Sequence, residues 1–306
     1  MTRVIYVNGR YLPYAQAAVH VEDRGFQLAD AVYEVIEVSG GDLVDATRHL
    51  ARLWRSLSEL AIEPPMSERA LRHVIAETLR RNRVSDGLVY LQVSRGASPR
   101  EFLAPDPPVS PTLVCIARSV PSGDADKRAE SGIAVITVPE TRWHRRDIKT
   151  VMLLPSSLAK QAAHAQGARE AWFVDSEGFI TEGASSNAWI ISRDGRLITR
   201  PLGHEILPGI TRRTVMDTAA SLGLTVEERP FTRDEAMAAA EAFVTSATNT
   251  VMPVVVIDGH KVSSGTPGPL TRQLRRAFAG IAERSPLRGK SSCPKSGPEA
   301  GSSGKP

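Results

Sequence analysis

The sequence predicts an α+β fold with mixed sheets and flanking helices. Segments with the character of strands outnumber the helical segments, and several of them follow one another as hairpins. The chain also shows no internal repeat. These observations favour a mixed arrangement over a doubly wound parallel sheet.

The first half of the chain is expected to open with a hairpin, in which the Asn8-Gly9 turn joins Val4–Val7 to Tyr11-Leu12. A helix is predicted at 49–60 because apolar residues recur there at helical spacing, and a second at 67–81 because Ser67 can cap it. Proline is too dense at 104–111 for anything but a loop. Strands are predicted at 32–38, 88–94 and 112–117.

The second half alternates short strands with helices, and turn sequences such as Asp175-Ser-Glu-Gly178 separate them. Strands are predicted at 133–138, 171–174, 188–191, 197–199, 242–245 and 254–257. Helices are predicted at 156–166, 211–222, 233–240 and 270–284.

Two domains are expected, because 306 residues suffice for two buried cores. Pro121, Ser122, Gly123 and a run of charges mark the linker. The predicted division is a small α/β domain at 1–120, the linker at 121–131 and a larger domain at 132–284. A Ser/Gly/Pro/Lys tail at 285–306 is interpreted as disordered.

The composition favours a cytoplasmic protein. No window approaches the ~20 apolar residues that span a bilayer, and the N-terminus lacks the apolar core of a signal peptide. Cys115 and Cys293 are the two cysteines, which cannot form a disulfide framework. A membrane location is therefore not expected.

The charge does not indicate a nucleic-acid partner, although the net charge is +4. The last 22 residues, 285–306, carry +3 of it, and the other basic residues are dispersed. No metal site is predicted either, because the seven histidines and two cysteines form no cluster with ligand spacing. Dinucleotide and phosphate-loop glycine motifs are also absent from the sequence.

A polar segment ending in a lysine, Arg142-Trp-His-Arg-Arg-Asp-Ile-Lys149, leads directly into an apolar run. A lysine at such an edge can be desolvated, which lowers its pKa from ~10.4 and frees a nucleophilic amine. The alternative is a surface lysine beside a buried strand, because lysine is rarely buried.

Two further segments are candidates for binding a ligand. Ile180-Thr-Glu-Gly-Ala-Ser-Ser-Asn187 places Glu182 in what we expect to be a tight loop between strands, although a plain polar turn is the alternative. Leu207-Pro-Gly-Ile-Thr-Arg212 enters a helix, whose N-terminal N–H groups and Thr211 hydroxyl form a natural phosphate site. Each signal is weak in isolation.

Taken together, the three segments resemble those of the fold-type-IV pyridoxal-phosphate enzymes. This family contains D-amino acid transaminases, branched-chain aminotransferases and aminodeoxychorismate lyases. The resemblance extends from Tyr6 to about Ile281. It implies the two-domain fold of that family and pyridoxal 5'-phosphate as cofactor.

The resemblance also implies roles for individual residues. Lys149 would hold the cofactor as a Schiff base and act as general acid–base, while Glu182 would pair with the pyridine nitrogen. The phosphate would be bound by Arg52 of His49-Leu-Ala-Arg52-Leu, together with Ile210 and Thr211. Ala247 stands where the family has a phosphate-binding threonine, so Ser246 or Thr248 is expected to compensate.

The segment around Tyr33 is similar to that of D-amino acid transaminases, in which this tyrosine lines the substrate pocket. Ser94-Arg-Gly-Ala-Ser-Pro-Arg100 resembles the segment that supplies an arginine for the substrate carboxylate from the partner subunit, which implies a homodimer. Phe102 departs from the family pattern, which has a histidine there.

The activity expected from this resemblance is ping-pong transamination of a D-amino acid, of the D-alanine type, with a 2-oxo acid. An (R)-selective amine transaminase is an alternative because Phe102 makes the pocket less polar. An aminodeoxychorismate lyase, a branched-chain L-amino acid transaminase and a non-catalytic family member remain further alternatives.

Overall fold

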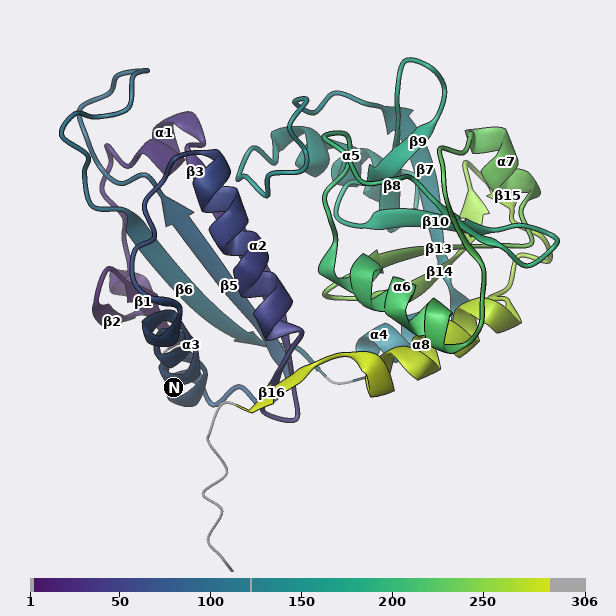
Figure 1. Ribbon diagram of the computed structural model, residues 1–306, viewed down its shortest axis with the longest axis horizontal. Coiled ribbons are helices and arrows are strands. Elements are labelled where there is room, and N and C mark those ends of the chain that lie inside the picture. Colours follow the sequence, from purple (N-terminus) through teal and green to yellow (C-terminus); the bar gives the residue numbers. More distant parts are fainter. Residues whose placement is uncertain (1–2, 122, 287–306) are drawn as a thin grey trace, which may run out of the picture.

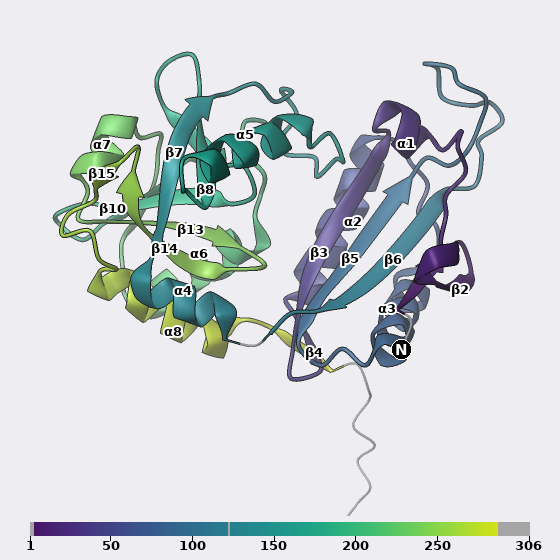
Figure 2. The same cartoon turned by 180° about the vertical axis from the view of Figure 1, so that it is seen from behind.

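The computed structural model describes residues 3–121 and 123–286, which form two β-sheets with helices packed against them (Figures 1 and 2). This confirms the α+β class with mixed sheets. Among the described residues, no helix combines the length and apolar character that crossing a membrane requires.

The first sheet has seven strands, and every neighbouring pair in it is antiparallel. Its order is β16 (Arg284–Pro286), β4 (Asp42–Val44), β3 (Ala31–Ser39), β5 (Gly87–Ser94), β6 (Thr112–Ser119), β1 (Val4–Val7) and β2 (Arg10–Pro13). The predicted hairpin and the strands of this half are confirmed.

Helices α2 (Ala46–Glu59) and α3 (Glu68–Asn82) pack on one face of this sheet, and two short helices, η1 (Tyr14–Gln16) and α1 (Arg24–Leu28), lie outside it. The core between them buries the apolar stripe of α2, including Leu50, Leu53 and Leu57. Ser67 caps α3 by accepting a hydrogen bond from the N–H of Ala70, as predicted.

The second sheet is mixed and has nine strands. Along its main path lie β12 (Val226–Glu228), β11 (Leu197–Thr199), β10 (Asn187–Ile191), β13 (Glu241–Ser246), β14 (Thr250–Ile257), β7 (Ile133–Pro139), β8 (Glu170–Val174) and β9 (Ile180–Gly183), and β15 (His260–Lys261) pairs with β14. The pairs β7–β8, β7–β14 and β11–β12 are parallel. The sheet curls so far that β9 approaches β10.

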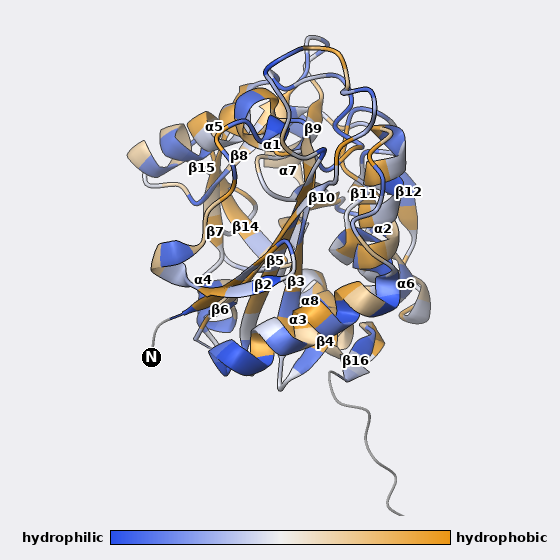
Figure 3. Cartoon of the chain, turned by 90° about the vertical axis from the view of Figure 1, so that its left-hand side faces the viewer, coloured by the Kyte–Doolittle hydropathy of each residue, from blue (hydrophilic) through white to orange (hydrophobic). Residues whose placement is uncertain are grey.

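Five helices pack against the curled sheet in three apolar clusters: α6 (Ile210–Ser221) and α8 (Pro269–Ile281) share one, α5 (Leu154–Ala165) belongs to a second, and α7 (Arg233–Ala238) and the short α4 (Asp124–Ser131) to a third. In Figure 3 the central strands β3 and β5 carry mostly hydrophobic residues, whereas α3 and α8 alternate between hydrophobic and hydrophilic ones. This pattern is expected where strands are covered and helices present one face to solvent.

Three expectations need correction. Residues 180–183 are strand β9 rather than part of a loop, because this short segment is completely buried and pairs with β8. Residues 124–131 of the expected linker form helix α4. Ser285 and Pro286, expected in a disordered tail, belong to strand β16, while residues 287–306 lie outside the described residues. The division into two domains remains a prediction.

The C-terminal end of the described chain returns to the first sheet, because α8 packs on the second sheet and β16 pairs with β4 (Figure 1). Asp45 secures this junction. Its carboxylate accepts hydrogen bonds from the Thr214 hydroxyl at 2.8 Å and from the Glu283 N–H at 3.0 Å. Asp45 is buried and has a left-handed φ of 51°.

We predict that Asp45→Ala destabilises the protein by about 1–3 kcal/mol, because one buried and one partly buried donor lose their acceptor. Asp45→Asn is the matched control, since it keeps an acceptor oxygen and tolerates the left-handed backbone. Thermal unfolding at a fixed protein concentration measures both variants. Equal losses for Ala and Asn would contradict the explanation by hydrogen bonding.

Candidate active site

Lys149 belongs to the segment that leaves the second sheet, residues 140–153, yet its backbone is attached to the first. The N–H of Tyr33 donates to the Lys149 carbonyl at 3.0 Å, and the N–H of Val151 donates to the Ala31 carbonyl at 3.1 Å. This pairing with the start of β3 brings the Lys149 Nζ to 3.2 Å from the Tyr33 hydroxyl. Two residues 116 positions apart therefore form one site.

Glu182 lies on β9 with its carboxylate buried. Its Oε1 accepts a hydrogen bond from Arg142 at 2.6 Å, and its Oε2 accepts from the Asn187 side chain at 2.9 Å and the Leu207 N–H at 3.1 Å. Burial raises the pKa of Glu182, and the opposing charge of Arg142 offsets only part of that rise. The carboxylate is thus held from three separate segments.

Asn187 connects Glu182 to the loop that precedes α6. Its side-chain N–H group also donates to the Leu207 carbonyl at 3.0 Å. Gly209, the N-cap of α6, approaches Asn187 so closely that a Cβ atom there would lie 2.0 Å from the Asn187 Oδ1. Only glycine fits this position without displacing the asparagine.

The N-terminus of α6 forms the other end of the site. No side chain of the described residues caps it, so Ile210 and Thr211 begin the helix with N–H groups available to an anion. The turn after β13 lies beside them and also lines the cavity through Ser246, Ala247 and Thr248. Ser246 and Thr248 stand on either side of Ala247 in the sequence, and their hydroxyls are 3.4 Å apart.

Arg52 reaches the same end of the cavity from α2 and is fixed by a buried acid that the sequence analysis missed. Its Nε and Nη2 donate to the two oxygens of Glu34 at 2.7 and 2.8 Å, and its Nη1 donates to the Pro208 carbonyl at 3.0 Å. His49 also contacts Glu34 at 2.7 Å. Burial would raise the pKa of Glu34, but Arg52 and His49 lower it to about 2.

A weak sequence signal for this cluster existed. Glu34 interrupts a strand of β-branched residues at a core-facing position, and His49 and Arg52 are three residues apart on one face of a helix. A buried acid requires a partner, and His49 and Arg52 provide two.

Arg100 does not reach the cavity of its own chain. It lies in the loop between β5 and β6, which projects away from the second sheet in Figure 1, and its guanidinium carbon is 5.6 Å from the centre of the Phe102 ring. The buried Arg24 fastens this loop by donating to the Glu101 and Leu103 carbonyls at 2.6 and 3.1 Å. Phe102 is 79% exposed.

Between the two sheets lies a cavity of about 220 Å³. It is lined by Tyr33, Lys149, Glu182, Arg52, Ile210 and Thr211 among others. An amine, a buried carboxylate and a group of anion-binding donors thus share one space. This donor set fits pyridoxal 5'-phosphate, which has an aldehyde, a basic ring nitrogen and a phosphate.

The comparisons with known proteins agree with this fit. The model of the amino-transferase class IV family matches residues 31–257. D-alanine aminotransferase of Bacillus licheniformis is 38% identical over 274 residues, covering 90% of this chain and 95% of that protein. The corresponding protein of Staphylococcus haemolyticus is 38% identical over 279 residues, covering 91% and 97%.

Among solved structures, a branched-chain amino acid aminotransferase of T.th. with pyridoxamine 5'-phosphate has a TM-score of 0.84 at 26% identity, covering 92% of this chain and 98% of that one. The Escherichia coli branched-chain enzyme has a TM-score of 0.84 at 24% identity, covering 96% and 98%. The fold is that of a fold-type-IV aminotransferase. This chain belongs to the class IV aminotransferase family, whose members depend on pyridoxal 5'-phosphate.

We predict that Gly209→Ala weakens cofactor binding by about tenfold or more, because the new Cβ must displace Asn187 and the first turn of α6. Equilibrium binding of pyridoxal 5'-phosphate to the cofactor-free protein, followed by absorbance, measures the change. Gly203→Ala is the control in the same segment, since a Cβ there meets nothing within 4 Å. Equal affinities of the two variants would contradict this account of Gly209.

Proposed function

We propose that this chain catalyses transamination between a D-amino acid and a 2-oxo acid by a ping-pong mechanism. The observation that carries the proposal is the Lys149 amine, which lies 3.2 Å from the Tyr33 hydroxyl in a cavity that also holds Glu182 and a set of phosphate-binding donors. The preference for D-amino acids is supported by relatives named D-alanine aminotransferase, which match about 90% of the chain.

Each residue has a proposed task. Pyridoxal 5'-phosphate supplies an electron sink for the electron pair released at the amino acid Cα. Lys149 holds the cofactor and moves the proton at Cα, and the Tyr33 hydroxyl orients its amine. Glu182 presents a negative charge to the ring nitrogen.

Binding of the phosphate is proposed for the opposite end of the cavity. Arg52 and the N-terminus of α6 at Ile210 and Thr211 would hold it, with hydroxyl groups from Ser246 and Thr248. Two hydroxyl groups flank Ala247, so we propose that they together replace the threonine of the family pattern.

We further propose a homodimer in which Arg100 of one subunit serves the cavity of the other. Within one chain the arginine lies outside the cavity, while the loop that carries it is firmly fastened by Arg24. Large apolar side chains are also exposed nearby, with Phe102 79% and Leu103 77% accessible. Such exposure is typical of a protein interface.

The branched-chain L-amino acid transaminases remain the second candidate, because a solved branched-chain amino acid aminotransferase covers 92% of this chain at a TM-score of 0.84. They are less similar in sequence, at 26% identity against 38% for the D-alanine enzymes. An (R)-selective amine transaminase and an aminodeoxychorismate lyase share the same cofactor chemistry and are distinguished by substrate.

We predict that D-alanine abolishes the visible absorption of the lysine-bound cofactor in a single turnover, and that a 2-oxo acid restores it. D-Alanine should react about 100-fold faster than L-alanine, because the site discriminates by transition-state binding. D-Glutamate, L-leucine and (R)-1-phenylethylamine complete the series, with Lys149→Ala as the inactive control. A faster reaction with L-leucine or with the aryl amine would transfer the assignment to the corresponding alternative.

We predict that Lys149→Ala and Arg100→Ala complement each other in a mixed dimer. Arg100→Ala alone should lose about 10- to 100-fold in kcat/KM, because a charge-assisted hydrogen bond to the substrate carboxylate is lost. In the mixed dimer one site regains both residues, so activity should return to about half of the wild-type value. Co-expression with two affinity tags isolates this species. An isolated mixed dimer without recovered activity would show that Arg100 does not act across subunits.

A further inference from the structure

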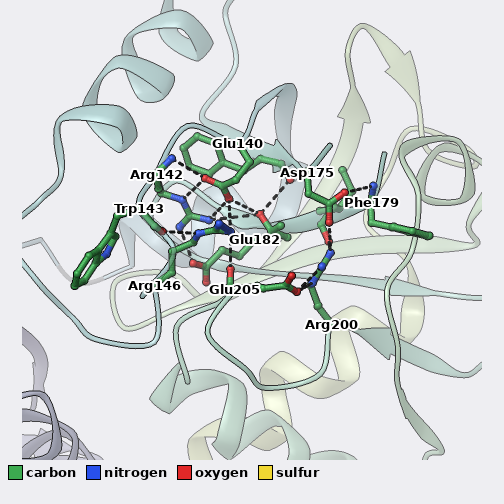
Figure 4. A network of polar contacts seen from close by, with 12 residues as sticks. Glu140, Arg142, Trp143, Arg146, Asp175, Phe179, Glu182, Arg200 and Glu205 are labelled. Atoms are coloured by element: carbon green, nitrogen blue, oxygen red, sulfur yellow. Dashed lines mark hydrogen bonds and ion pairs between the residues drawn. The ribbon is translucent and has the colours of Figure 1, made fainter. Parts of the chain in front are cut away.

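Beside Glu182 lies a buried row of alternating charges, whose two arginines, Arg142 and Arg146, also line the cavity (Figure 4). Arg142 donates to Glu182 through Nη1 at 2.6 Å and to Glu140 through Nη2 and Nε at 2.6 and 3.0 Å. Arg146 follows, at 3.3 Å from Glu140. All four side chains are at most 10% exposed.

The row solves an electrostatic problem of the site. Burial favours the protonated form of Glu182, and a protonated carboxyl has no negative charge to offer a ring nitrogen. Arg142 stabilises the charged form but shares its guanidinium with Glu140, whose own charge acts on Glu182 in the opposite direction. Arg146 compensates Glu140, so the four groups together are neutral with both carboxylates ionised.

The geometry of the row is fixed from outside as well. Arg146 also donates to the Trp143 and Glu205 carbonyls at 2.9 and 3.3 Å, and the Thr181 hydroxyl donates to Glu140 at 2.9 Å. Neither Glu140 nor Arg146 contacts Glu182 directly. Their influence on the carboxylate therefore passes through Arg142 and through space.

Other groups near Glu182 leave this influence undisturbed. From β10 and the loop before α6, Asn187 and the Leu207 N–H contribute neutral hydrogen bonds. Lys149 lines the same cavity. Beyond Arg146, Arg200 is engaged in its own ion pairs with Asp175 and Glu205.

We infer that the buried Glu140–Arg146 pair consists of positioning residues that, together with Arg142, set the net charge around the ionised Glu182 and thereby the proton affinity of the cofactor's ring nitrogen. This inference rests on the proposed role of Glu182. Removing the charge of Glu140 leaves an excess positive charge beside Glu182, which weakens the hold on the ring proton. Removing the charge of Arg146 leaves an excess negative charge and strengthens that hold.

The test is made in the holoenzyme and compares two variants that should shift the pKa of the ring nitrogen in opposite directions. Glu140→Gln and Arg146→Met change the charge in opposite directions, whereas a loss of packing would move both variants the same way. The ring nitrogen is labelled with ¹⁵N, and its chemical shift is titrated with pH beside the visible spectrum. We expect the ring-nitrogen pKa to fall by about one unit in Glu140→Gln and to rise by about one unit in Arg146→Met.

Two controls accompany the pair. Glu140→Asp keeps the charge, so its ring nitrogen should titrate as in the wild type. This result separates the effect of the lost charge from a purely structural effect of the substitution. Glu205→Gln removes a carboxylate that is 59% exposed and belongs to the neighbouring Arg200 cluster, so it should leave the titration unchanged. Circular dichroism establishes that each variant is folded.

Shifts in the same direction, or no shift in folded variants, would overturn the inference. A ring nitrogen that is unprotonated throughout the titration, in the wild type and in every variant, would instead contradict the proposed role of Glu182 itself. The two failures are therefore distinguishable by the wild-type titration alone.

Discussion

The buried carboxylate of Glu182 is the constraint on which the rest of the site depends. An ionised carboxylate inside a protein is tolerated only when hydrogen bonds and an opposite charge replace water. Here Arg142 supplies the charge, and Asn187 and the Leu207 N–H supply the hydrogen bonds. These partners come from three segments, so satisfying one acid also fixes the loop that leads into α6. The close approach of Gly209 to Asn187 follows from the same arrangement.

At the opposite end of the cavity the buried charge is a cation, and it too requires an opposite charge and hydrogen bonds to replace water. Arg52 is buried and is held on two sides, by the carboxylate of Glu34 and by the Pro208 carbonyl. Glu34 belongs to the first sheet and Pro208 to the loop that Asn187 holds from the other side. The two ends of the cavity are therefore connected through residues 207–209, and a change at either end is transmitted to α6. Asp45 and strand β16 fix the sheets relative to each other over a longer distance.

The fold was largely predictable from the sequence, because periodicity and turn residues are local signals. Hence the hairpin at the N-terminus, α2, α3 and most strands lie where expected. Strand β9 was missed because it is only four residues long and partly polar. Its pairing with β8 is what makes it a strand. Contiguous motifs indicated Lys149, Glu182 and Thr211 as candidate residues, and the structure brings all three to one cavity. Glu34 and Arg142 acquire their importance from partners distant in sequence, Arg52 and Glu182, which a local pattern indicates weakly at most. Arg100 lies outside the cavity of its own chain, so its proposed role depends on a second subunit.

Arg52 already donates hydrogen bonds to protein partners on one side, and this decides what it can offer a ligand in the cavity. The guanidinium of Arg52 has five N–H groups, of which Glu34 and Pro208 use three, so two remain for an anion. Glu34 cancels much of the positive charge of Arg52. Arg52 therefore contributes directed hydrogen bonds to an anion more than long-range electrostatic attraction. The uncapped N-terminus of α6, with no compensating acid in its first turn, must therefore supply a large part of the attraction for a phosphate. The proposed reliance on backbone groups is the reason why the prediction for this end of the site concerns the position of Gly209 and not a further lysine or arginine.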